Sequence, residues 1–205
     1  MSMQLIATVA GAPVPVDEVD AAEARLRNGP RGAALPASGT SEGRQLRRWL
    51  TQLIVTERVV AAEAAARGLT ATDAPTEADL LPDVTARLEI GSVAAAALAD
   101  WRARALFADV TAGVRVGDHE VADFHARNPL RFAPPRPGSH GWRAPSFVAP
   151  PLAQVRSVIA EHLLGAARRR AFRVWLDARR AALVELAPGY EHPGDPRQPD
   201  NTHRH

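Results

Sequence analysis

The 205-residue chain contains no cysteine and no lysine. The absence of cysteine excludes disulfide bonds, thiol nucleophiles and thiolate metal ligands. All 25 residues in the lysine and arginine count are arginines, and the formal net charge is only +2. The sequence pI of 10.2 therefore reflects the high pKa of arginine rather than a large excess of positive charge. On this ground we expect no nucleic-acid partner.

Long apolar runs and a targeting signal are absent as well. No window approaches the roughly 18 apolar residues that a membrane-spanning helix needs. The N-terminal stretch MSMQLIATVAGAPVPVDEVD has no basic beginning and no apolar run of signal-peptide length. The sequence therefore predicts a cytoplasmic protein with no membrane partner.

Two motifs that would indicate particular enzyme chemistry are missing. No P-loop occurs, so the sequence offers no motif of that kind for ATP binding. The Gly-x-Ser-x-Gly elbow of an acyl-transferring enzyme is also absent, since the nearest string, PGSHG, lacks the first glycine. These absences favour a protein that is not an enzyme but do not decide the question.

Hydrophobic residues make up 46% of the chain, many of them alanine, whereas aromatic residues make up only 5%. Such a composition favours helices. Apolar residues recur at helical spacing in several segments that end at glycine or proline. The predicted helices comprise residues 45–67, residues 83–110 with a break near Gly91, residues 118–128, and a long helix over residues 152–186.

The N-terminal segment has a different pattern. Residues 5–9 are typical of a strand, Gly11 predicts a turn, and Pro13 and Pro15 confine the next stretch to a sheet edge. Asp17 is suited to cap the helix that follows. We therefore expect an all-α, mainly helical fold with a short N-terminal β-arm or hairpin.

Composition divides the chain into a helical part and a polar end. Residues 1–188 are expected to form one helical domain, in which residues 129–151 are a loop because seven prolines prevent a helix from crossing them. Residues 189–205, GYEHPGDPRQPDNTHRH, form a separate tail rich in histidine, aspartate and proline. No pattern indicates an oligomeric state.

Four stretches of the sequence suggest a known scaffold. These are IATVAGAPVPVDEVDA, LRRWLTQLIVTERVVAAEAAARGLTAT, VRVGDHEVADFHARNPLRF and RRRAFRVWLDARRAALVEL. In this order they resemble the N-terminal arm, the second helix, a short helix ending in Asn-Pro-x-x-Phe, and the C-terminal helix of one family. That family comprises the SurA-like and trigger-factor-type chaperones and the parvulin-type (PpiC) foldases.

The resemblance implies a SurA N-terminal-like helical architecture that binds an unfolded polypeptide or a partner protein through an apolar groove, without ATP. It also implies no isomerase activity, because the short segment APPRPGSHGWRAPSFVAPP stands where the family's isomerase domain would be. The candidate peptide-binding residues are Trp49, Leu53, Phe124, Phe132 and Trp175. Large apolar side chains at helical spacing are equally typical of a core, so both interpretations remain.

Arginines cluster on the last predicted helix, at residues 168–170 and 179–180. Such clusters could bind a phosphate backbone or an acidic partner. Glu161, Asp177 and Glu185 lie in the same segment, however, and predict a solvated, partly ion-paired face. His162, in the middle of this helix, is expected to be structural.

The tail contains a candidate metal site. His203 and His205, two positions apart in an extended segment, lie on the same side and could share one divalent ion with His192. A metal site there would predict a metal-using enzyme or an accessory factor of a biosynthetic pathway on the same scaffold. The tail could instead dock on a protein surface or stay unfolded, since chain ends rich in polar residues and proline commonly do either. No other cofactor is expected.

Overall fold

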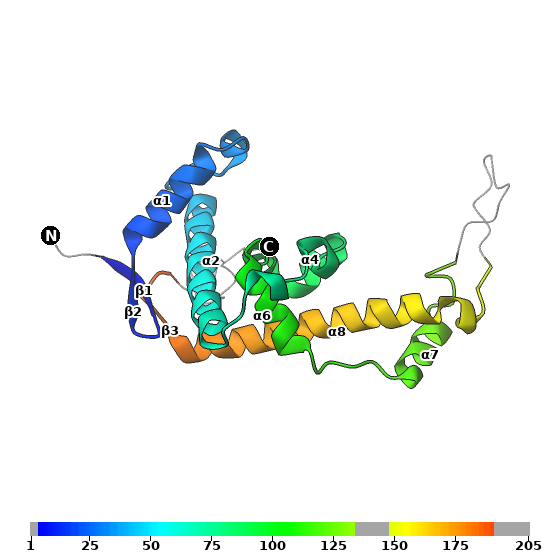
Figure 1. Ribbon diagram of the computed structural model, residues 1–205. Coiled ribbons are helices and arrows are strands. Elements are labelled where there is room, and N and C mark those ends of the chain that lie inside the picture. Colours follow the sequence, from blue (N-terminus) through cyan, green and yellow to red (C-terminus); the bar gives the residue numbers. More distant parts are fainter. Residues whose placement is uncertain (1–3, 134–147, 191–205) are drawn as a thin grey trace, which may run out of the picture.

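The structure is a computed structural model that describes residues 4–133 and 148–190 (Figure 1). It is mainly helical with one small sheet that includes the N-terminal strands, which confirms the predicted fold class. In chain order the elements are β1 (Leu5–Val9), β2 (Ala12–Pro15), α1 (Val16–Arg27), η1 (Gly32–Ala34), α2 (Ser41–Ala66), η2 (Ala71–Asp73), α3 (Glu77–Leu80), α4 (Val84–Ile90), α5 (Ser92–Ala97), α6 (Trp101–Thr111), α7 (Asp118–Arg127), α8 (Leu152–Leu183) and β3 (Val184–Leu186).

The sheet has the strand order β2-β1-β3, and both pairs are antiparallel. β1 and β2 form the predicted hairpin. Ala10 and Gly11 turn the chain between them with φ values of 50° and 78°. Positive φ at both central residues gives a two-residue turn whose twist matches that of the strands. Glycine at the second position adopts this conformation without steric cost.

β3 corrects the predicted extent of the last helix. The sequence predicts a helix through residue 186, whereas α8 ends at Leu183 and the next three residues pair with β1. The N–H of Ala10 donates to the carbonyl of Leu183 at 2.7 Å, and the N–H of Ala187 donates to the carbonyl of Ile6 at 2.8 Å. The edge of β1 that is not paired with β2 supplies the partners for these hydrogen bonds. The helical periodicity of the sequence gives no sign of this pairing.

α2 is the central helix of the larger core. It begins at Ser41, four residues before the predicted start, because the hydroxyl of Thr40 accepts a hydrogen bond from the N–H of Gly43 at 3.0 Å. A Cβ at position 43 would lie 2.3 Å from the carbonyl oxygen of Ala37. Glycine therefore lets the preceding loop lie directly on the first turn of the helix, which packs against α1, α5, α6 and α8.

The segment predicted as one interrupted helix over residues 83–110 consists of three helices. Gly91, with a φ of 89°, separates α4 from α5 at the break that the sequence indicates. Asp100 then caps α6 by accepting a hydrogen bond from the N–H of Arg102 at 2.8 Å. The two breaks let α5 and α6 pack against α2 while α4 packs against α8.

α8 takes part in two separate apolar clusters. Its C-terminal half contributes Phe172 and Leu176 to the larger core. Its N-terminal half contributes Val155 and Ile159 to a smaller cluster with Val121 of α7. At a rise of about 1.5 Å per residue, Ile159 and Phe172 lie about 20 Å apart along the helix axis. As a result, α7 and the N-terminal half of α8 extend away from the main body (Figure 1).

Candidate functional site

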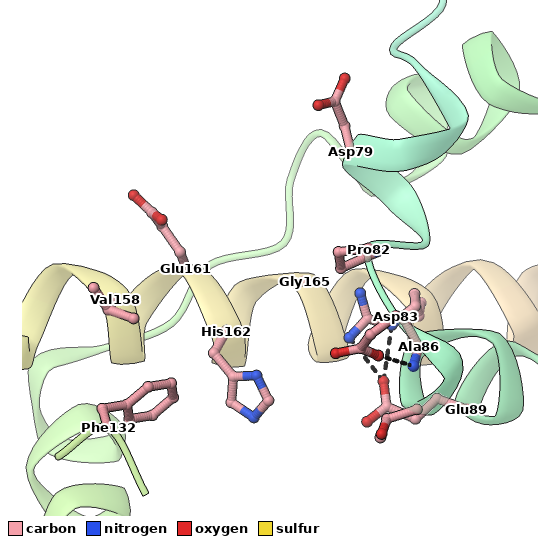
Figure 2. Close-up of a pocket in the computed structure, with 12 residues that line it drawn as sticks. Asp79, Pro82, Asp83, Ala86, Glu89, Phe132, Val158, Glu161, His162 and Gly165 are labelled. Carbon is pink, nitrogen blue, oxygen red and sulfur yellow. Dashed lines mark hydrogen bonds and ion pairs between the residues drawn. The ribbon is translucent and has the colours of Figure 1, made fainter. Parts of the chain in front are cut away.

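A groove crosses α8 at Gly165, between the chain that follows α7 on one side and α3 and α4 on the other (Figure 2). It consists of two adjoining hollows with volumes of about 290 and 220 Å³. Both hollows are lined by Asp79, Glu161, Gly165 and Arg169; the first also reaches Phe132 and His162, and the second reaches Phe107 and Leu164. These two hollows together form what we call the α8 groove.

The floor of the groove depends on a glycine beside a buried arginine. Arg169 is only 6% exposed, and both its Nε and its Nη2 lie 2.8 Å from Oε2 of Glu89. Its Nη1 also donates to the carbonyl of Leu80 at 3.3 Å. A Cβ at position 165 would lie 3.1 Å from Nη1 of Arg169, which is tighter than an ordinary contact. Gly165 therefore leaves space both for this guanidinium and for the hollow above it.

Three rings pack together at the N-terminal side of the groove, and two of them, Phe132 and His162, line its first hollow. The ring of His162 lies 5.6 Å from that of Phe124 and 5.7 Å from that of Phe132, measured between centroids. Burial lowers the pKa of His162 below its usual value of 6.5, and the charge of Arg131 acts in the same direction. The imidazole is therefore neutral at pH 7 and serves as a third, partly apolar ring.

Four carboxylates line the first hollow, those of Asp79, Asp83, Glu89 and Glu161. Hydrogen bonds from the hydroxyl and the N–H of Thr76 lower the pKa of Asp79, so this group is ionised at neutral pH. Asp83 caps α4 by accepting from the N–H of Ala86 at 2.8 Å. The exposed carboxylate of Glu161 makes no hydrogen bond or ion pair with any residue that the structure describes. Among the described residues Arg169 is the one arginine that lines this hollow, so its described lining is acidic as a whole.

Apolar side chains are exposed in the groove and elsewhere on α4. Val158 lines the first hollow and is 47% exposed. Val84 and Leu88, one turn apart on α4, are 71% and 75% exposed and lie on the side of that helix opposite its buried residues. Val84 and Leu88 line neither hollow, and isolated exposed apolar residues are common, so Val158 is the exposed apolar residue that matters for the groove.

The five predicted peptide-binding residues fall into two groups. Trp49, Leu53 and Trp175 pack against the larger core, whereas Phe124 and Phe132 pack against the smaller cluster. The ring of Trp175 stacks on Phe172 at 5.8 Å, and Trp49 donates its indole N–H to the hydroxyl of Ser92 at 3.2 Å. The structure therefore does not bring the five residues to one surface. Of the five, Phe132 lines the α8 groove, and the ring of Phe124 lies 6.2 Å from it, measured between centroids.

The arginines of α8 differ in part from the prediction of a solvated face. Arg169 is buried, and its carboxylate partner is Glu89 of α4. The partner of Arg179 is Glu63 of α2, at 2.5 Å. Ion pairing is thus present as predicted, but it connects α8 to neighbouring helices. A one-dimensional pattern shows acids on the same helix and cannot show those brought near by folding.

The proposed metal ligands His192, His203 and His205 lie outside the described residues. Within residues 4–133 and 148–190, no group of three histidine, aspartate or glutamate side chains is placed to hold a metal ion. The histidines of α7 lie apart: His119 faces Asp123 at 3.5 Å, and His125 lies 2.9 Å from the carbonyl of Pro150.

Several residues of the groove were not predicted as site residues from the sequence. Gly165 in the string LLGAARRR offered a signal, because a glycine inside a long helix costs stability and indicates close packing or an open surface. Asp79, Asp83 and Glu89 gave no comparable signal, since they are distant in sequence from α8. Their place beside Glu161 follows from the packing of α4 on α8.

Residues 5–42 match a family of unknown function, DUF7158. This segment comprises β1, β2, α1 and the beginning of α2, and it does not include the α8 groove. No curated protein and no solved structure matches the chain. Across the described ranges, no helix combines the length and the apolar character needed to cross a membrane.

Proposed function

We propose that the chain is a polypeptide-binding module with chaperone-like activity, independent of ATP and without isomerase activity, and that the α8 groove is its binding surface. The observation that carries this proposal is that Val158 and Phe132 lie in an open hollow, where a half-exposed valine is available to another chain. Burying apolar side chains is the main source of affinity for a segment bound in a groove.

The size of the groove supports a polypeptide rather than a cofactor. Neither hollow, at about 290 and 220 Å³, exceeds the lower end of the range of roughly 300 to 1,000 Å³ that is typical of small-molecule sites. Two small, adjoining hollows on one surface are suited to successive side chains of an extended segment.

The chemistry of the groove also supports binding rather than catalysis. Thr85 is the only hydroxyl-bearing residue that lines either hollow, and its side chain has no hydrogen-bond partner among the described residues. A nucleophile of this type would need an adjacent base to activate it. In the described part of the chain, none of the carboxylates of the hollow accepts a hydrogen bond from Thr85, and His162 contacts two phenylalanine rings instead.

The resemblance to the chaperone scaffold supports the same surface. Its most specific stretch, EVADFHARNPLRF, supplies Phe124 and Phe132. In the structure Phe132 and His162 line the first hollow of the α8 groove, and the ring of Phe124 packs against both.

The test compares two exposed valines of α8. Val158 lines the groove, whereas Val174, 61% exposed, lines neither of its hollows. Val158→Asn is expected to weaken the binding of an uncharged apolar peptide about tenfold, since burying a valine contributes about 1.5 kcal/mol. Val174→Asn is expected to leave affinity unchanged, because Val174 lies outside the groove. It is a matched control, because both substitutions change the helix propensity of α8 by the same amount. Fluorescence anisotropy with a labelled peptide measures both.

Suppression of the aggregation of an unfolded model client provides the second readout. The Val158 variant is expected to suppress aggregation less than the wild type, and the Val174 variant to match it. Equal effects of the two substitutions, or wild-type binding by both, would contradict the assignment of the groove.

A further inference from the structure

We propose that the α8 groove selects polypeptide segments in which a basic side chain lies next to an apolar one. This inference rests on the proposed polypeptide-binding function and specifies its substrate class. Complementary charge across an interface favours correct partners and repels wrong ones, even where it adds little total affinity.

The first hollow has an excess of negative charge. Four carboxylates line it against one arginine, and the guanidinium of Arg169 is already paired with Glu89 at 2.8 Å. His162 is neutral at pH 7 because burial lowers its pKa. Among the described residues no further cation lines this hollow, so Asp79, Asp83 and Glu161 are in excess there. Arg168 lines the second hollow, which Asp79 and Glu161 also line, so across the whole groove four carboxylates face two arginines.

Two of these carboxylates are available to a ligand. Glu161 is exposed and has no partner in the described part of the chain, so both its oxygens can accept hydrogen bonds from a ligand. Asp83 uses only Oδ1 to cap α4. A guanidinium or ammonium group at the mouth of the hollow would thus meet acceptors that no described residue occupies.

Apolar surface lies directly beside the acids. Val158 and Glu161 are three residues apart on α8, so their side chains are neighbours on the helix surface. Both line the hollow whose wall includes Phe132 (Figure 2). A bound segment can therefore bury one side chain against Val158 and Phe132 while the adjacent basic side chain reaches Glu161.

A metal ion fits this site less well than a basic side chain. No three of the acidic or histidine side chains in the described part are close enough together to hold an ion. Carboxylates spread along a groove are instead suited to an extended polypeptide. Its lysine or arginine side chains have long aliphatic parts that let the charged group reach one of several acids.

The experiment uses the full-length protein and a set of labelled peptides that share one apolar sequence. The central apolar residue is flanked by Arg, Gln or Glu, and a fourth peptide keeps the Arg but replaces the apolar residue with Ser. Affinity is measured by fluorescence anisotropy at low and at high salt. We expect the Arg peptide to bind about fivefold more tightly than the Gln peptide, and the Glu peptide to bind most weakly. Added salt should reduce these differences.

The variant Glu161→Arg is expected to abolish or reverse this order. Asp17→Arg is the matched control, because Asp17 is an exposed acid on α1, lies outside the groove, and gives the same change of net charge. The control should keep the order of the wild type.

Each outcome has a distinct meaning. Peptides that bind without regard to charge, or an order that persists in the Glu161 variant, would overturn this inference while leaving the proposed function in place. The inference would also be overturned if the peptide with Arg and Ser bound as tightly as the peptide with Arg and the apolar residue, since charge alone would then suffice for binding. Failure of every peptide to bind would overturn the proposed function itself.

Discussion

Arg169 shows how a single residue shapes the groove. An arginine that is only 6% exposed would be costly to bury without a charge partner, and Glu89 supplies one from the neighbouring helix. Gly165 makes this arrangement possible, because a side chain there would crowd the guanidinium. Arg169 is the one arginine among the described residues that line the first hollow, and its charge is paired with Glu89. The remaining carboxylates therefore define the charge of that surface.

The Arg169–Glu89 pair is expected to stabilise the fold. Glu89→Ala should lower the free energy of unfolding by about 2–3 kcal/mol, because it leaves Arg169 buried without its partner. The expected loss is below that for a fully buried pair because the Glu89 side chain is 36% exposed. Urea denaturation measures the change.

The control for that experiment is Glu77→Ala, which breaks the exposed Arg87–Glu77 pair at 2.8 Å. Since both of its partners are exposed by more than a third, the expected loss is under about 1 kcal/mol. If both variants lost the same free energy of unfolding, the burial of Arg169 would not make its ion pair more stabilising than an exposed one.

At the scale of the elements, helices were predicted well where local signals are strong. α7 spans Asp118–Arg127, close to the predicted residues 118–128, and it ends before Asn128 and Pro129, as expected from the proline that follows. α2 was predicted from its apolar periodicity, but its first turn was missed because the glycine-rich string before it suggested a loop. β3 was missed entirely, because a strand of three residues exists only through its pairing with β1.

β3 provides a prediction at this scale. Glu185 lies opposite Thr8 of β1, between Leu183 and Ala187, which both hydrogen-bond to β1. Because hydrogen-bonded residues alternate along an antiparallel ladder, the N–H of Glu185 also points toward β1. Glu185→Pro removes the N–H of that position and should lower the free energy of unfolding by about 2–3 kcal/mol. It should also speed amide exchange at Ala10, whose N–H donates to Leu183.

Glu185→Ala is the control for the loss of the side chain. Glu185 is exposed, and its carboxylate accepts only a 3.4 Å hydrogen bond from Thr8, so a change of under about 0.5 kcal/mol is expected. If the alanine and proline variants behaved alike, pairing of β3 with β1 would not contribute to stability.

At the scale of the whole molecule, α8 joins the small cluster around α7 to the larger core, and the groove lies between them. The five residues predicted for one binding surface therefore separate along this helix. Trp175 lies about 20 Å from His162 along the axis, at a rise of about 1.5 Å per residue. The aromatics near the C-terminal end of α8 support packing of the core, while those near its N-terminal half form the groove.

The C-terminal segment tests the proposed function against a metal-dependent one. A chain ending at Tyr190 keeps the hydrogen bond from the side chain of Gln52 to the carbonyl of Tyr190, at 2.9 Å. If the α8 groove is the binding surface, this truncation should leave peptide affinity and aggregation suppression unchanged. Loss of function on truncation, together with a near-stoichiometric metal ion in the intact protein by elemental analysis, would instead favour a metal-using enzyme or accessory factor.

The sequence by itself determined the helical class, the N-terminal hairpin, the break at Gly91 and the short helix α7. Each of these depends on local physics: apolar periodicity, caps, and residues with restricted or unusual backbone angles. Only the tertiary structure decided which acids face α8, which arginine is buried, and that residues 184–186 join β1. Those features depend on residues that are distant in the chain and meet only when α4 packs on α8 and β3 pairs with β1. A sequence pattern contains no measure of that proximity.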